Sequence, residues 1–441
     1  MTHAKNIFTY MLALFSTLAI VGCSFEEDHA DCQGKGEGEK MQVELRLTAS
    51  ASSLTRSYST SDGVTRASWV DTNAAPSGEM MHNCFVVIVQ NGKIQDIVVK
   101  NDFTEEEVEQ TNLKAKAELG SATFYSFANI TPAELGITMT TTPAEIESKY
   151  YKVEGNTTTL SDKGIPMSNK QTFNITNKKQ QVDLEVIRMM AKVELNFTND
   201  TGYDLNIKSV KLTDITDNAA NNVSLLPMKD ASGNVVPNIN ASATYKDYTV
   251  SIGGTSGTQV KNGGTLQTTF YVNESVARNP KYFVLSINTD KGTVTNRIAM
   301  TEWSKIARND YLVIPVKLVD YRIELEPQVF TAIGVIPELS YSVDRITATF
   351  KSYGEFHLKL HVIKRSDNTE LNNWTFKSIR TLEADPAGGE GTSIYDEEPY
   401  FEKRTKTFEG YISPRKGYAI HEINVEINGV TIPYRLQINK E

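Results

Sequence analysis

Hydrophobic and polar residues alternate along much of the chain after residue 40, and this pattern predicts β-strands. Val43, Leu45 and Leu47 alternate with polar side chains, which is the period of two expected for a strand with one buried face. The apolar run 84–89 predicts a buried strand, and Asn91-Gly92 predicts a tight turn into a partner strand at 94–99. Further strands are expected at 124–129, 205–212, 248–252, 266–272, 282–288, 293–300, 311–318, 346–350 and 356–363.

Other segments connect or interrupt these strands. Residues 48–78 are rich in Ser, Thr, Ala and Gly and predict a long loop. Residues 182–197 form a continuous β-like run, which predicts one strand shared by two domains. Pro132 and Pro143 each follow a threonine, and this pair is typical of the start of a short helix.

The chain ends in a predicted hairpin, with strands at 423–427 and 430–438 joined by Asn428-Gly429. Alternation predicts that one side of the last strand is apolar and carries Val430, Ile432, Tyr434, Leu436 and Ile438. Pro433 favours an edge position, because proline cannot donate a hydrogen bond to a neighbouring strand.

The length and composition predict a folded protein of several domains. For 441 residues we expect β-domains at 41–185 and 186–320, followed at 321–441 by a C-terminal β-domain or a donor-strand region. The net charge is −9 with no dense basic stripe, so no nucleic-acid partner is expected. Three cysteines and six histidines, without a Cys-x-x-Cys pair, exclude a disulfide scaffold and leave little for a zinc module.

The first residues predict export. Residues 1–22 combine Lys5 with an apolar run that is short for a membrane span, as in a secretory signal peptide. The run ends in Ile20-Val21-Gly22-Cys23, which resembles a bacterial lipobox and predicts that Cys23 is acylated. The alternative is an ordinary signal peptide with an incidental cysteine. No later stretch reaches spanning length, so we expect attachment to the membrane through lipid.

Residues 23–40 are expected to form a lipidated linker. The linker begins with the acidic tract Ser24-Phe25-Glu26-Glu27-Asp28, which is similar to the tract that routes lipoproteins to the outer face of the outer membrane; a plain solvated linker is the alternative. Cys32 lies in this linker and Cys84 in an apolar run. A disulfide between them is compatible with export, but two free thiols are favoured.

Candidate chemistry is sparse. His357 and His361 lie on a predicted strand, where four residues span about 13 Å, so they cannot share one metal ion. The acidic, glycine-rich segment 385–398 is better interpreted as a solvated loop than as a calcium site. Catalytic motifs are missing, and the sequence therefore predicts a protein that is not an enzyme and has no metal or cofactor.

Several motifs, together with the acylated start and the arginine-containing loop after the first strand, resemble the fimbrillins that build type V pili. The motifs are Phe124-Tyr125-Ser126-Phe127-Ala128-Asn129, Ile165-Pro166-Met167-Ser168, Val186-Ile187-Arg188-Met189-Met190-Ala191-Lys192-Val193-Glu194, Phe270-Tyr271-Val272-Asn273-Glu274 and Ile306-Ala307-Arg308-Asn309-Asp310-Tyr311. The resemblance covers residues 1–320.

The resemblance implies tandem transthyretin-like β-sandwiches, a lipoprotein of the outer membrane, and a place in a surface fimbrium that supports adhesion. It also implies assembly with other pilus subunits by strand exchange. An arginine-specific protease removes the first strand, which carries Val43, Leu45 and Leu47, and the last strand of another subunit fills the groove. Arg66-Ala67 is the expected cleavage site because a small residue follows the arginine, with Arg56 as the second choice.

The region after residue 321 exceeds the terminal strands of a shaft subunit and favours a tip or accessory role. Tip, shaft and anchor positions nevertheless remain open, as does the surface ligand. The alternative is that the first strand is kept, as in anchor-type subunits, and remains an ordinary strand of the sheet. A surface glycan-binding lipoprotein and a secreted hydrolase are the alternative functions.

Overall fold

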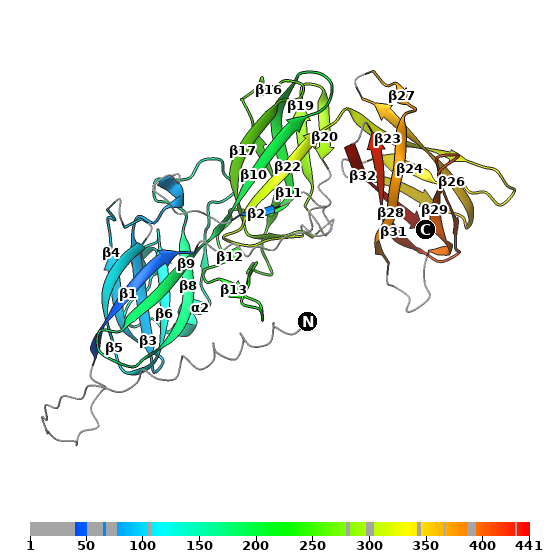
Figure 1. Cartoon of the computed structure of the whole chain (residues 1–441). Helices are drawn as coiled ribbons and strands as arrows, with labels where there is room; N and C mark the ends of the chain where they lie inside the picture. Colours follow the sequence, from blue (N-terminus) through cyan, green and yellow to red (C-terminus); the bar gives the residue numbers. More distant parts are fainter. Residues whose placement is uncertain are drawn as a thin grey trace, which may run out of the picture. The chain divides into compact units, whose positions relative to one another are not determined.

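The computed structural model describes residues 40–50, 65–67, 77–104, 107–108, 110–278, 283–296, 304–341, 345–365, 367–385, 394–427 and 430–441. Three β-sandwiches follow one another along the chain (Figure 1). The predicted fold class is confirmed: the protein is mostly β, with tandem sandwiches, a few short helices and a C-terminal β-domain.

The first sandwich contains one sheet of seven strands in the order β4-β3-β6-β8-β9-β1-β5. Its strands are β1 (Met41–Ala49), β3 (Cys84–Gln90), β4 (Lys93–Lys100), β5 (Gln110–Ala117), β6 (Gly120–Ala128), β8 (Met167–Ile175) and β9 (Gln181–Arg188). The sheet folds over one apolar core, to which β1, β5 and β9 contribute from one side and β3, β6 and β8 from the other. Strand β3 is buried on both faces, which explains why its sequence is continuously apolar.

The second sandwich packs a four-stranded sheet, β17-β10-β22-β2, against a five-stranded one, β15-β11-β19-β20 with β16 beside β11. Their bounds are β2 (Thr65–Ala67), β10 (Met190–Asn199), β11 (Leu205–Thr216), β15 (Tyr245–Ser251), β16 (Thr258–Val260), β17 (Thr265–Asn273), β19 (Leu285–Thr289), β20 (Gly292–Asn296) and β22 (Tyr311–Leu318).

The third sandwich joins the sheet β23-β26-β30-β29, with β27 beside β26, to the sheet β24-β25-β32-β31-β28 around a separate core. Its strands are β23 (Tyr321–Gln328), β24 (Glu338–Tyr341), β25 (Ile346–Phe350), β26 (Gly354–Lys364), β27 (Glu370–Leu371), β28 (Trp374–Ala384), β29 (Tyr395–Glu402), β30 (Thr407–Ile412), β31 (Gly417–Ile427) and β32 (Val430–Lys440).

Short elements complete the fold. The helices are η1 (Ser77–Glu79), α1 (Pro132–Leu135) and α2 (Pro143–Glu147). As the Thr-Pro pairs predicted, α1 and α2 begin at a capping box formed by a threonine and the glutamate three residues later. Paired two-residue strands lie outside the main sheets: β7 (Tyr150–Tyr151) with β12 (Val223–Ser224), β13 (Met228–Lys229) with β14 (Val235–Val236), and β18 (Ser275–Val276) with β21 (Lys305–Ile306).

Two expectations about the connections need correction. The run 182–197 is not one strand: β9 ends at Arg188 and β10 begins at Met190, and the two belong to different sandwiches. Apolar residues fall on even numbers up to Val186 and on odd numbers from Ala191, and this change of phase in the sequence marks the break. The loop expected at 48–78 contains strand β2, which pairs with β22 and satisfies backbone groups at that sheet edge.

Candidate assembly site: the first strand and its groove

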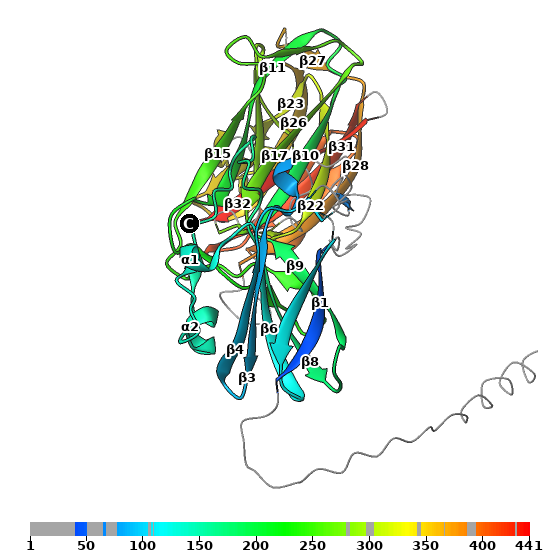
Figure 2. The same cartoon turned by 90° about the vertical axis from the view of Figure 1, so that its left-hand side faces the viewer.

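Strand β1 lies inside its sheet rather than at an edge. It pairs with β5 in the antiparallel direction from Met41 to Thr48 and with β9 in the parallel direction from Glu44 to Ala49. Figure 2 shows β1, in dark blue, in the first sandwich with β8 and β9. Because neighbours bond to both of its edges, removal of β1 would leave two rows of unpaired backbone groups.

The inward face of β1 fills part of the first core. Val43, Leu45 and Leu47 are essentially inaccessible, with exposures of 0%, 1% and 0%. Loss of one such leucine side chain from a core costs about 2–5 kcal/mol. Removal of β1 would therefore open an apolar groove in the first core.

Arg66 and Ala67 lie in β2, at the edge of the second sandwich. Arg66 pairs with Leu312 and Ala67 with Tyr311 on β22. The peptide bond between them is thus inside a three-residue strand, and a protease that binds an extended substrate requires β2 to leave β22 first. Arg56 lies outside the described residues.

Strand β32 lies between β31 and β25 in the third sandwich. Tyr434, Leu436 and Ile438 are buried in its core, and Ile432 is half-buried against the same core, as the alternation predicted. The side chain of Val430 is not described, although its backbone pairs with Ile427 across a two-residue turn.

The edge position that Pro433 favoured is wrong for β32, which is a central strand. The proline itself lies where β32 has one partner strand. It lies opposite Asn424 on β31, whereas the pairing of β32 with β25 begins only at Leu436. The missing N–H group of the proline therefore falls outside the stretch that β25 covers.

The sequence has three cysteines, of which the structure describes one. Cys23 and Cys32 lie outside the described residues, and Cys84 is a free thiol in the first core. Burial raises the pKa of the Cys84 thiol to about 12, which keeps it protonated and unreactive at neutral pH.

The two histidines of β26 contact carboxylates rather than each other. His357 lies 3.2 Å from Glu355 and 3.5 Å from Glu409, and His361 lies 3.0 Å from Glu326 and 2.7 Å from Glu370. Among the residues that the structure describes, no three His, Cys, Asp or Glu side chains gather as metal ligands would. Part of the acidic segment 385–398 lies outside those residues.

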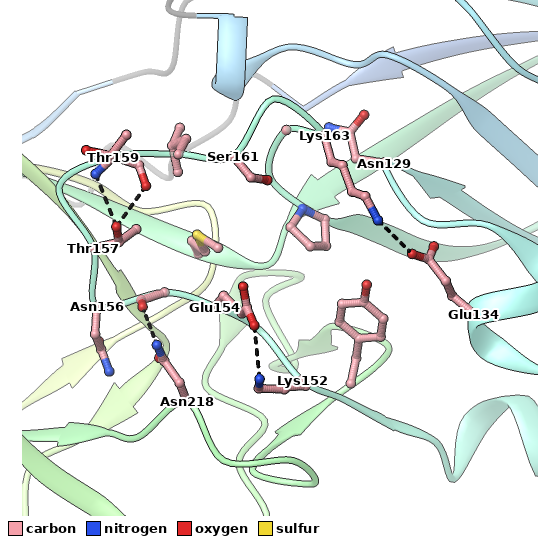
Figure 3. A pocket seen from close by; sticks show the side chains of 16 residues that line it. Asn129, Glu134, Lys152, Glu154, Asn156, Thr157, Thr159, Ser161, Lys163 and Asn218 are labelled. Carbon is pink, nitrogen blue, oxygen red and sulfur yellow. Dashed lines mark hydrogen bonds and ion pairs between the residues drawn. The ribbon is translucent and has the colours of Figure 1, made fainter.

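A polar cavity of about 850 Å³ lies beside the segment 129–166 and also touches Met190 and Asn218 (Figure 3). Its charged side chains pair with each other: Lys163 lies 3.5 Å from Glu134, and Lys152 lies 3.0 Å from Glu154. The cavity wall is thus neutral, with no excess charge to attract an ionic ligand.

Exposed tryptophan pairs would favour the glycan-binding alternative. Of the three tryptophans, Trp374 alone lies within the described ranges, and it is buried against Phe401. In the part of the chain that the structure describes, no helix has the length and apolar character to cross a membrane.

The residues around the carboxyl end of β1 were missed by the sequence reasoning. Arg188, Glu79 and Asn309 are buried polar side chains near Ser50. A single arginine inside the apolar run 186–191 was the available signal, since charged side chains are rarely buried without partners. The partners themselves come from distant parts of the chain.

Neither a known protein-family model nor a curated protein matches the chain. Among solved structures, it is similar to the tip fimbrial protein Mfa3 of Porphyromonas gingivalis with a C-terminal truncation, at 10% identity and a TM-score of 0.42, covering 74% of this chain and all of that one. A fimbrial assembly protein of Parabacteroides distasonis is 12% identical, with a TM-score of 0.37 and coverage of 76% and 98%. The fimbrilin FimA of Porphyromonas gingivalis is 11% identical, with a TM-score of 0.35 and coverage of 63% and 97%. These are fimbrial proteins, the class that the sequence motifs resemble.

Proposed function

We propose that this chain is a tip subunit of a cell-surface pilus, and that it accepts a strand from a neighbouring subunit in place of β1 while keeping its own last strand. The observation that carries the proposal is the position of β32, which lies inside the third sandwich and supplies Tyr434, Leu436 and Ile438 to its core. Because β32 completes the core of the third sandwich, we infer that it stays in this chain and is not donated to a neighbour.

The composition of β32 also makes it a poor strand for the β1 groove. If Ile432 and Tyr434 took the places of Val43 and Leu45, then Pro433 would take the place of Glu44. Position 44 pairs with strands on both sides, with Lys114 on β5 and Gln181 on β9. Proline lacks the N–H group for such a ladder and is disfavoured in a central strand. In that register a second copy of this chain is a weak donor, which favours a different subunit as the donor.

The remaining steps of the proposal come from the sequence motifs. The lipobox cysteine Cys23 anchors the precursor at the outer membrane, and an arginine-specific protease cuts after Arg66 to free β1. The pairing of β2 with β22 is compatible with this step, because three residue pairs hold the described strand. The subunit then belongs to a surface fimbrium and supports adhesion to a surface ligand.

The N-terminus of the chain in purified pili tests this proposal. Mass spectrometry should show that the chain at the pilus end begins at Ala67. The reason is that β1 must leave before another strand can enter its groove. A chain in assembled pili that retains residues 41–50 would contradict strand acceptance at β1. A start at Ser57 would move the cleavage site to Arg56.

Lipid anchoring has a separate test. Replacing Cys23 with alanine should move the unprocessed precursor from the membrane fraction to the soluble fraction, because the acyl chains would be its attachment. The matched control is Cys32→Ala, which should partition like the natural chain. Unchanged partitioning and electrophoretic migration of Cys23→Ala would refute the lipobox assignment.

A further inference from the structure

The carboxyl end of β1 is held by groups from the first two sandwiches. Ser50 is 3% exposed, and its N–H donates to the carbonyl of Val186 at 2.7 Å. Its carbonyl oxygen accepts two hydrogen bonds, from Nη1 of Arg188 at 3.2 Å and from Nδ2 of Asn309 at 3.2 Å. A single main-chain oxygen thus joins β1 to the end of β9 and to the turn before β22.

Arg188 is a buried cation that needs acceptor oxygens. Its side chain is fully buried, and its Nε and Nη2 atoms donate to the carbonyl of Glu79 at 3.3 and 3.2 Å. The Glu79 carboxylate is in turn held by Lys192 at 2.8 Å and by the hydroxyl of Tyr271. A guanidinium in such a place loses its hydration, so the loss of an acceptor such as the Ser50 carbonyl is costly.

Asn309 is positioned without help from β1. Its backbone has a left-handed φ of 62°, and its N–H donates to the carbonyl of Met190 at 2.9 Å. Its Oδ1 atom accepts from Nη1 of Arg188 at 3.4 Å. Contacts outside β1 therefore already aim both donors at the place where the Ser50 carbonyl lies.

We propose that Arg188 and Asn309 are the end stop of the acceptor groove, where they bind a main-chain carbonyl of whichever strand occupies the β1 position. This inference rests on the proposed strand-accepting function and specifies the partner. The partner is an extended segment in which three apolar residues alternate with other residues. The segment continues for three more residues after the last apolar one, which is the spacing from Leu47 to Ser50. A shorter segment would fill the apolar part of the groove, but it would offer no carbonyl oxygen to Arg188 and Asn309.

Two peptides can test the end stop on the full-length chain. The chain carries one engineered protease site within residues 51–64, so that β1 becomes exchangeable after cleavage. The probes are the acetylated and amidated peptides 40–50 and 40–48, which compete with a labelled 40–50 peptide. We expect the longer peptide to bind at least tenfold more tightly, because it adds hydrogen bonds to a charged donor and to the ladder.

The variant Asn309→Gly shows how much of the longer peptide's advantage comes from the contact with its Ser50 carbonyl and how much from its greater length. Glycine accepts a left-handed φ, so the turn is kept while the Nδ2 donor is lost. The advantage of the longer peptide should shrink by about three- to tenfold in this variant, as in a double-mutant cycle. The matched control is Asn91→Gly, at an exposed turn with a φ of 51°, which should keep the natural ratio.

The outcomes distinguish the two proposals. An equal advantage of the longer peptide in Asn309→Gly and in the natural chain would overturn the end stop while strand acceptance stands. Failure of both peptides to bind the cleaved chain would overturn strand acceptance itself, and the end stop with it.

Discussion

Deletion of residues 428–441 should unfold the third sandwich and leave the first two folded. The deletion removes β32 from between β25 and β31, and with it Tyr434, Leu436 and Ile438 from the core. The first two sandwiches have cores of their own. Hydrogen exchange read by mass spectrometry should therefore show loss of protection across 321–427 and retained protection in β3, β6 and β10.

A point variant gives the same test with less disruption. Leu436 is 1% exposed, and Leu436→Ala should lower the free energy of unfolding of the third sandwich by about 2–5 kcal/mol. The control is Thr431→Ala on the same strand, at an exposed position, where the expected change is within about 0.5 kcal/mol. A shortened chain that keeps its third sandwich folded but no longer joins a neighbour would identify β32 as a donor strand and overturn the tip proposal.

Replacing Arg66 with alanine should nearly abolish incorporation of the chain into pili without destabilising it. The uncut chain keeps β1 covalently attached, so the strand that leaves its groove remains tethered beside it at high effective concentration and outcompetes an incoming strand. Incorporation can be measured as the amount of this subunit per purified pilus. The free energy of unfolding should change little, because alanine keeps the main-chain pairing of β2 with β22.

Two arginines provide controls for this result. Arg46 lies on β1 and forms an exposed ion pair with Asp183 at 2.8 Å, so Arg46→Ala should assemble normally and change the free energy of unfolding little. Arg56→Ala should also assemble normally if Arg66 is the cleavage site. Loss of incorporation in Arg56→Ala and not in Arg66→Ala would assign the cleavage to Arg56.

Local patterns were sufficient to predict most individual elements of this protein. The alternation of Val43, Leu45 and Leu47 predicted a strand and its buried face, and both are present in β1. The Thr-Pro pairs predicted the starts of α1 and α2, because the capping box uses residues only three apart. These features depend on side chains that are neighbours in the sequence.

The neighbours of each strand were not predictable in this way. Backbone N–H and C=O groups are alike in nearly all residue types, so they do not select a neighbouring strand. Alternation therefore shows which face of β1 is buried but not that β5 and β9 flank it. For the same reason, the pattern did not show that β2 lies on β22.

The candidate end stop depends on the tertiary structure most of all. Asn309 lies 259 residues from the Ser50 carbonyl that it binds, and Arg188 lies 138 residues from it. The sequence alone determined that the chain is built of strands, which of their faces are apolar, and that an arginine interrupts an apolar run. Only the tertiary structure decided which groups accept hydrogen bonds from Arg188. These acceptors are main-chain and side-chain oxygens that become its neighbours when two sandwiches pack together.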